Sequence, residues 1–151
     1  MVVGRHISSA FFVALLMAIG SGCSKSETSK TVLPAGGTVT MDGQPLAGAN
    51  LTFIPADGTA GQGGTGSTDA AGKYEMTHFR SGKGVEPGAY RVVISKLVMQ
   101  DGSPIPPGTH SAAELATKDA VPSRYSDYNN TTLTATVDAA GKPIDFALKS
   151  R

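Results

Sequence analysis

The sequence predicts an all-β fold, an antiparallel seven-stranded β-sandwich with one long loop. Three observations predict it. Short runs alternate apolar and polar residues, turn-forming residues separate these runs, and 28 of the 151 residues are glycine or proline. A single strand with one apolar face is unstable in water, whereas two sheets packed face to face bury all such faces together.

The first two expected strands are joined through a tight turn. Residues 37–41 form the first, and Asp42-Gly43 is a dipeptide that strongly favours a hairpin turn after it. The second strand covers 49–54 and directs three apolar residues to one face, namely Ala49, Leu51 and Phe53. Period-two alternation of this kind indicates a strand with one buried face.

The middle of the chain contains three further strands. Residues 55–66 form a glycine-rich loop, and 66–68 form a short edge strand. The strand 73–79 has Tyr74 and Met76 on one face, and 89–97, the clearest strand, brings together Tyr90, Val92 and Ile94. We expect the two tyrosine rings to be buried, with each hydroxyl bonded to a partner.

The last two strands lie near the end of the chain. In residues 131–137, apolar residues alternate with threonines, and a second run at 144–148 points Ile144, Phe146 and Leu148 inward. The turn at 138–141 joins these two runs. The end of the chain therefore closes the sandwich.

One long insertion, residues 98–124, interrupts this rhythm and carries four prolines. Within it, Ser111 to Glu114 matches a helix capping box, which predicts a short helix on the loop. Loops of this length are often functional and otherwise mobile, and the sequence leaves both readings open. His110, Tyr125 and Tyr128 are the candidate ligand-contacting residues of this region.

The first 22 residues read as a secretory signal, with a weakly positive start, a short apolar run and small residues before Cys23. A lone cysteine in this position resembles a bacterial lipobox, although Gly20 stands where leucine is usual. The resemblance implies cleavage before Cys23, acylation of its thiol and amine, and stable membrane anchoring by more than one acyl chain. The alternative is an ordinary signal with an incidental cysteine.

This reading divides the chain into a signal peptide at 1–22, a lipid-anchored flexible tether at 23–35 and a folded domain at 36–151. The tether is polar and ends near Pro34. We expect a protein of the cell envelope, periplasmic or surface-facing, held at the membrane through Cys23.

Three segments carry a resemblance to a known family. They are Gly37 to Gly48, Thr68 to Tyr74 and Pro87 to Ile94. Together they resemble the carboxypeptidase regulatory-like domain, and residues 121–148 resemble small lipoproteins of planctomycete bacteria. The resemblance implies a prealbumin-like (Ig-like) sandwich and no catalytic zinc domain.

The sequence carries no recognisable catalytic motif. Beyond the leader, the chain has two histidines, His78 and His110, and neither lies in a zinc-binding pattern. No nucleophile elbow GxSxG occurs. We expect His78 at the surface or rim of the sandwich and His110 exposed. The sequence thus predicts no metal site and no cofactor.

The near-neutral net charge argues against nucleic acid as a partner. Thirteen basic and twelve acidic residues give no field that would attract nucleic acid. The expected function is a non-catalytic envelope module that binds an envelope protein or a polysaccharide through loop tips or a sheet edge. With no tryptophan in the chain, sugar binding is the weaker of these two. An envelope hydrolase using His78 or His110 is the alternative.

Overall fold

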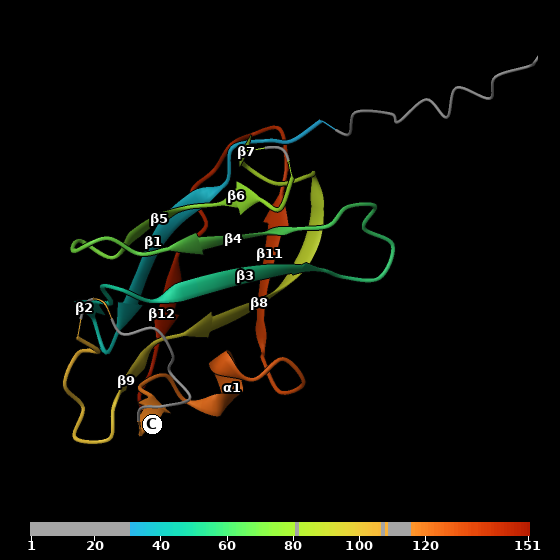
Figure 1. Ribbon diagram of the computed structural model, residues 1–151. Coiled ribbons are helices and arrows are strands. Elements are labelled where there is room, and N and C mark those ends of the chain that lie inside the picture. Colours follow the sequence, from blue (N-terminus) through green and yellow to red (C-terminus); the bar gives the residue numbers. More distant parts are fainter. Residues whose placement is uncertain (1–30, 81, 107, 109–115) are drawn as a thin grey trace, which may run out of the picture.

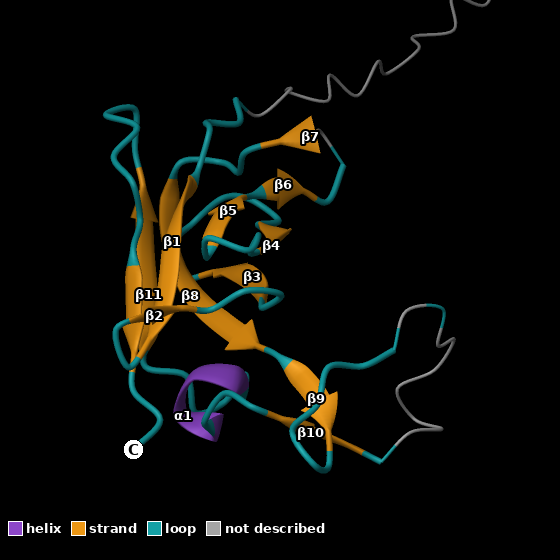
Figure 2. Cartoon of the chain, turned by 90° about the vertical axis from the view of Figure 1, so that its left-hand side faces the viewer, coloured by secondary structure: helices purple, strands orange, loops and turns teal. Residues whose placement is uncertain are grey.

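The computed structural model describes residues 31–80, 82–106, 108 and 116–151, and these form a β-sandwich. Two sheets pack face to face, with the core between them (Figure 1; Figure 2). The predicted all-β class is confirmed. No helix in the described part of the chain has the length and apolar character needed to cross a bilayer.

The first sheet has four strands, centred on β1 (Gly36–Met41). β1 pairs antiparallel with β2 (Gln44–Pro45) and with β5 (Lys73–Glu75), and parallel with β12 (Phe146–Leu148). The β1–β12 ladder is the one parallel pairing among the described strands. It places the end of the chain beside the start of the folded body.

The second sheet has six strands in the order β11-β8-β3-β4-β6-β7. All of its ladders are antiparallel, and the longest joins β3 to β8 over six residue pairs. The bounds are β3 (Asn50–Pro55), β4 (Gly64–Ser67), β6 (Thr77–His78), β7 (Gly82–Lys83), β8 (Gly88–Ser95) and β11 (Leu133–Val137).

Two expectations for individual strands were wrong. The run 73–79 is two strands in different sheets, β5 and β6, because the chain crosses between the sheets at Met76, whose amide donates to the Ala35 carbonyl (2.8 Å). β4 is also an inner strand between β3 and β6, not an edge. A Cβ on Gly64 would lie 2.4 Å from the Thr77 carbonyl oxygen, so glycine permits this close approach.

Four aromatic rings occupy the centre of the core. Phe53 has its ring centroid 5.6–6.4 Å from the rings of Tyr74, Tyr90 and Phe146. As expected, both tyrosines are buried and bonded: the Tyr74 hydroxyl donates to the Ile144 carbonyl (2.7 Å), and that of Tyr90 to the Glu86 carbonyl (2.6 Å). Burial raises the pKa of Tyr90 to about 12, so its hydroxyl remains a donor at physiological pH.

The insertion differs from the expected loop. It begins as a hairpin in which β9 (Leu97–Met99) pairs with β10 (Thr117–Asp119), and this hairpin projects from one end of the sandwich (Figure 2). The expected helix around Ser111 to Glu114 lies outside the described residues. A four-residue helix, α1 (Ser123–Ser126), follows the hairpin instead.

The segment before β1 is attached to the body. The Leu33 amide donates to the Val85 carbonyl (2.8 Å), and the Val85 amide donates back to the Leu33 carbonyl (3.0 Å). The folded body therefore includes the last residues of the expected tether, and the chain enters it beside β7 (Figure 1).

Candidate functional site: the open edge of strand β11

His78 is buried, which corrects the expected surface position. Its side chain is 6% exposed, and Nε2 lies 3.0 Å from Oε1 of Glu86. The backbone amide of Arg80 donates to Nδ1 (3.1 Å). Because Nδ1 accepts, a neutral ring carries its proton on Nε2 and donates it to Glu86. Both nitrogens are therefore engaged within the fold, and neither is open to act as a general base.

Glu86, the partner of His78, is 3% exposed and holds the glycine-rich loop. Oε1 also accepts from the Gln62 amide (3.2 Å). Burial acts to raise the pKa of this carboxyl, but hydrogen bonds from its own amide, Gln62 and His78 outweigh it and hold the pKa below the usual value. Oε2 has no hydrogen-bond partner in the described part of the chain, and it faces Gly61. The pair fastens the loop to the body.

Two predicted site residues, Cys23 and His110, lie outside the described residues. In the part of the chain that the structure describes, no cluster of three or more His, Cys, Asp or Glu side chains is placed to hold a metal ion.

Tyr125 and Tyr128, the remaining predicted site residues, each stack against an arginine. The Arg124 guanidinium lies 4.8 Å from the Tyr125 ring centroid, and that of Arg91 lies 4.9 Å from the Tyr128 ring. Hydrogen bonding from Arg124 lowers the pKa of Tyr125. One face of each ring is therefore covered by a guanidinium, while Tyr128 remains 53% exposed.

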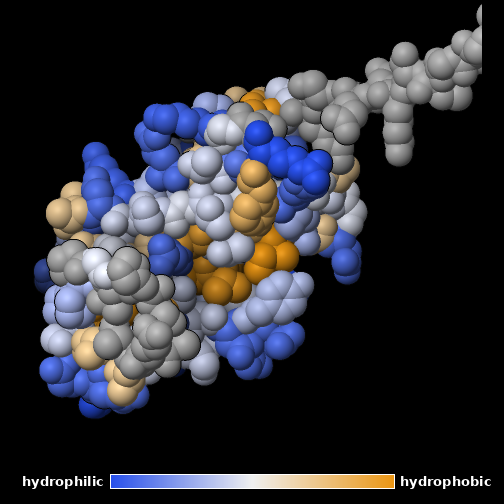
Figure 3. Space-filling view, in the orientation of Figure 1, coloured by the Kyte–Doolittle hydropathy of each residue, from blue (hydrophilic) through white to orange (hydrophobic). Residues whose placement is uncertain are grey.

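The outer face of the six-stranded sheet carries an apolar patch over β3 and β8 (Figure 3). By strand alternation, the half-buried residues Ile54 and Val93 point to this face, opposite the buried Phe53 and Val92. The patch is small, and the Arg91–Tyr128 pair belongs to the same face.

β11 stands at one end of the six-stranded sheet and pairs only with β8, so its other edge is free. The Val92 carbonyl accepts from the Thr131 hydroxyl on the β11 side, whereas the Ala89 carbonyl accepts from Ala56 on the β3 side. Alternate residues of a strand bond to opposite neighbours. It follows that Ala135, opposite Tyr90, bonds β8, and that the backbone groups of Thr134 and Thr136 face away from it.

No backbone hydrogen bond within the described residues engages Thr134 or Thr136 on this outer edge. Their side chains are exposed as well. The edge therefore presents two N–H donors and two C=O acceptors in the spacing that an added strand requires.

A hollow of about 310 Å³ runs beside this edge, between β11 and the segment 141–145 that leads to β12. It arises because the two arms of the chain around the turn at 138–141 belong to different sheets: β11 pairs with β8, and β12 pairs with β1. The sandwich is therefore hollowed along β11.

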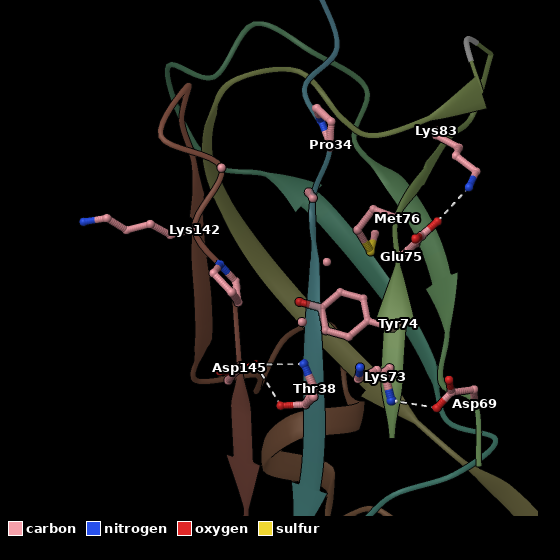
Figure 4. Close-up of a pocket in the computed structure, with 15 residues that line it drawn as sticks. Pro34, Thr38, Asp69, Lys73, Tyr74, Glu75, Met76, Lys83, Lys142 and Asp145 are labelled. Carbon is pink, nitrogen blue, oxygen red and sulfur yellow. Dashed lines mark hydrogen bonds and ion pairs between the residues drawn. The ribbon is translucent and has the colours of Figure 1, made fainter. Parts of the chain in front are cut away.

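A second, larger hollow of about 820 Å³ adjoins the first and shares Pro34 and residues 141–143 and 145 with it. Figure 4 shows the Tyr74 ring at its centre, with Lys142 extending away from it. Its acidic groups are engaged within the fold: Asp145 accepts from Thr38, and Glu75 pairs with Lys83 (2.9 Å). The acidic side chains of the larger hollow are therefore already bonded within the fold, whereas Lys142 is exposed beside both hollows.

Sequence reasoning identified β11 but not its role. The threonines at 132, 134 and 136 showed which face is polar, yet alternation does not reveal which strand lacks a neighbour.

The comparisons with known proteins returned no match: no family model, no curated protein and no solved structure is similar to this chain. The resemblance to the carboxypeptidase regulatory-like domain stays a prediction.

Proposed function

We propose that this protein is a non-catalytic, lipid-anchored binding module of the cell envelope that receives an extended polypeptide along β11. The observation that carries the proposal is the free outer edge of Thr134 and Thr136 beside an open hollow. An added strand would satisfy these backbone groups through main-chain hydrogen bonds, which require an extended conformation but little sequence specificity.

The environment of His78 argues against an envelope hydrolase that uses this histidine as its base; His110, the other histidine of that alternative, lies outside the described residues. A hydrolase base must reach a nucleophile or a water molecule next to the substrate. His78 is buried and bonded at both ring nitrogens, to Arg80 and Glu86.

The same surface favours a polypeptide over a polysaccharide. A strand edge with free donors and acceptors matches a peptide backbone.

The proposed anchor is lipid on Cys23. Residues 24–30 separate it from the described body, and the eight steps from Cys23 to Thr31 span at most about 29 Å when fully extended. A domain on such a tether stays close to the membrane, where its partners would be envelope proteins.

The binding proposal is tested by photocrosslinking in cells. A benzophenone amino acid at position 136 of the full chain should crosslink to a polypeptide, whereas the same probe at Lys118, on the exposed face of the distant β10, should not. Thr134→Pro removes an outward N–H without touching the β8 ladder and should abolish the crosslink. Thr134→Val keeps the N–H and should preserve it. Crosslinking that survives Thr134→Pro would contradict strand addition.

The anchor is tested separately by acyl labelling. We expect globomycin-sensitive processing and incorporation of labelled fatty acid into the chain, with both lost in Cys23→Ala. Label that persists in that variant would refute lipidation at Cys23, while leaving the crosslinking result at β11 to be judged independently.

A further inference from the structure

The chain enters the folded body at one end of the sandwich, which we call the entry end. Leu33 bonds to Val85, and the β6–β7 hairpin lies at the same end as the entering chain (Figure 1; Figure 2). The insertion hairpin β9–β10 and α1 lie at the opposite end. If residue 23 is held in a bilayer, the short segment 24–30 draws the first of these ends toward it.

This entry end carries an exposed aromatic residue. Phe79 follows His78 at the end of β6 and is 55% exposed, although His78 itself is buried. Two other large apolar side chains in the described part of the chain have comparable exposure. Leu97 belongs to β9 at the opposite end, and Tyr128 stacks against Arg91 on the outer face of the six-stranded sheet. A solvent-exposed phenylalanine on a hairpin is suited to the interface between lipid headgroups and acyl chains.

Basic residues accompany Phe79. Arg80 is its neighbour, and Lys142 lies in the loop after β11; both are exposed. Lys83 forms an exposed ion pair with Glu75, and the carboxylate of Asp138 accepts from the Ala140 amide. Asp145 lines the same hollow as Lys142, so three acidic side chains accompany the three bases of this region and its net charge is near zero. The attraction to anionic lipid would therefore come from Arg80, directly beside Phe79, and would add modestly to the apolar contact.

Such a surface need not bind strongly by itself. A domain already held within a few tens of ångströms of a bilayer experiences a high effective concentration of lipid, so a weak contact is enough to fix its orientation. We propose that the entry end, defined by Phe79, Arg80, Lys83 and Lys142, docks on an anionic lipid surface. This inference rests on the proposed lipid anchor, and it leaves the β11 edge free along the side of the sandwich.

The chain contains no tryptophan, so a single introduced tryptophan reports on one position. The full chain, processed in cells and purified in detergent, is reconstituted into vesicles of phosphatidylcholine and phosphatidylglycerol with brominated acyl chains. In Phe79→Trp we expect a blue-shifted emission and loss of fluorescence by bromine quenching. In the matched control Leu97→Trp, at the opposite end, we expect neither change.

Charge variants then separate docking from mere proximity. Arg80→Gln with Lys142→Gln should reduce the quenching of the tryptophan at position 79, and high salt should do the same. The control pair Lys118→Gln with Lys149→Gln should leave it unchanged. Equal quenching at positions 79 and 97, or none at either, would overturn the proposal.

Mass spectrometry of the same samples keeps the two proposals apart. A chain without acyl groups would refute the anchor alone. The docking surface would then be judged by coupling that unlipidated chain through Cys23, the one cysteine of the sequence, to maleimide-bearing lipid in the same vesicles. The absence of preferential quenching at position 79 in this tethered chain would refute it too.

Discussion

Two glycine- and proline-rich segments of this protein have similar composition but are held very differently. The loop 55–63 is fastened to the sandwich by Glu86 and by Thr59, whose hydroxyl donates to the Ala89 carbonyl (2.9 Å) and accepts from its amide (3.0 Å). The insertion hairpin β9–β10 forms its ladder with itself. The buried carboxylate of Glu86 therefore makes the loop 55–63 an integral part of the folded body, unlike the β9–β10 hairpin. The glycine and proline content of the two segments does not reveal this difference.

The comparison predicts that removing Glu86 has the largest effect on stability. Glu86→Ala leaves His78 and the Gln62 amide without their partner and should lower the free energy of unfolding by about 3 kcal/mol. Urea unfolding followed by circular dichroism measures this loss. Glu86→Gln retains the shape and one acceptor and should cost clearly less; an equal cost would show that charge, not bonding, secures the loop.

The next largest effect is expected at Gly61. A Cβ there would lie 2.8 Å from the Cδ of Glu86, so Gly61→Ala must displace the buried carboxylate. We expect a loss of about 1–2 kcal/mol in urea unfolding. Gln62→Ala keeps the backbone amide that bonds Glu86 and serves as the control. A neutral Gly61→Ala would mean that the loop shifts without penalty.

Acid should weaken the same loop. The pKa of Glu86 lies below its usual value of 4.5, so folding favours the charged form. The stability it contributes is complete above the usual pKa and is lost as pH falls through the lower, folded-state value. Below pH 4.5 the wild type should therefore lose more stability than Glu86→Gln. Parallel pH profiles for the two proteins would contradict this role.

The smallest effect is expected in the insertion hairpin. Leu97 is 44% exposed, so Leu97→Ala should change the free energy of unfolding by less than about 0.5 kcal/mol. Amide hydrogen exchange provides a second measurement: amides of β9 and β10 should exchange faster than those of β8. A global loss of stability in Leu97→Ala would show that the hairpin is part of the body.

Much of the fold could be predicted from local sequence. Alternation located β1, β3, β8 and β11, and Asp42-Gly43 forms the expected turn, with φ of 51° and 82°. Asp69 likewise accepts from amides of its own turn, those of Ala71 and Lys73. These features depend on residues close together in the chain, so the sequence alone determines them.

Tertiary structure decided the rest. The parallel pairing of β1 with β12 joins residues more than a hundred positions apart. The buried position of His78 depends on the carboxylate of Glu86, which lies in the connection between β7 and β8. The free edge of β11 exists only because the chain then turns into the other sheet. Period-two alternation gives the face of a strand but not its neighbours, because pairing is settled by which backbone groups meet once the two sheets close on a shared core.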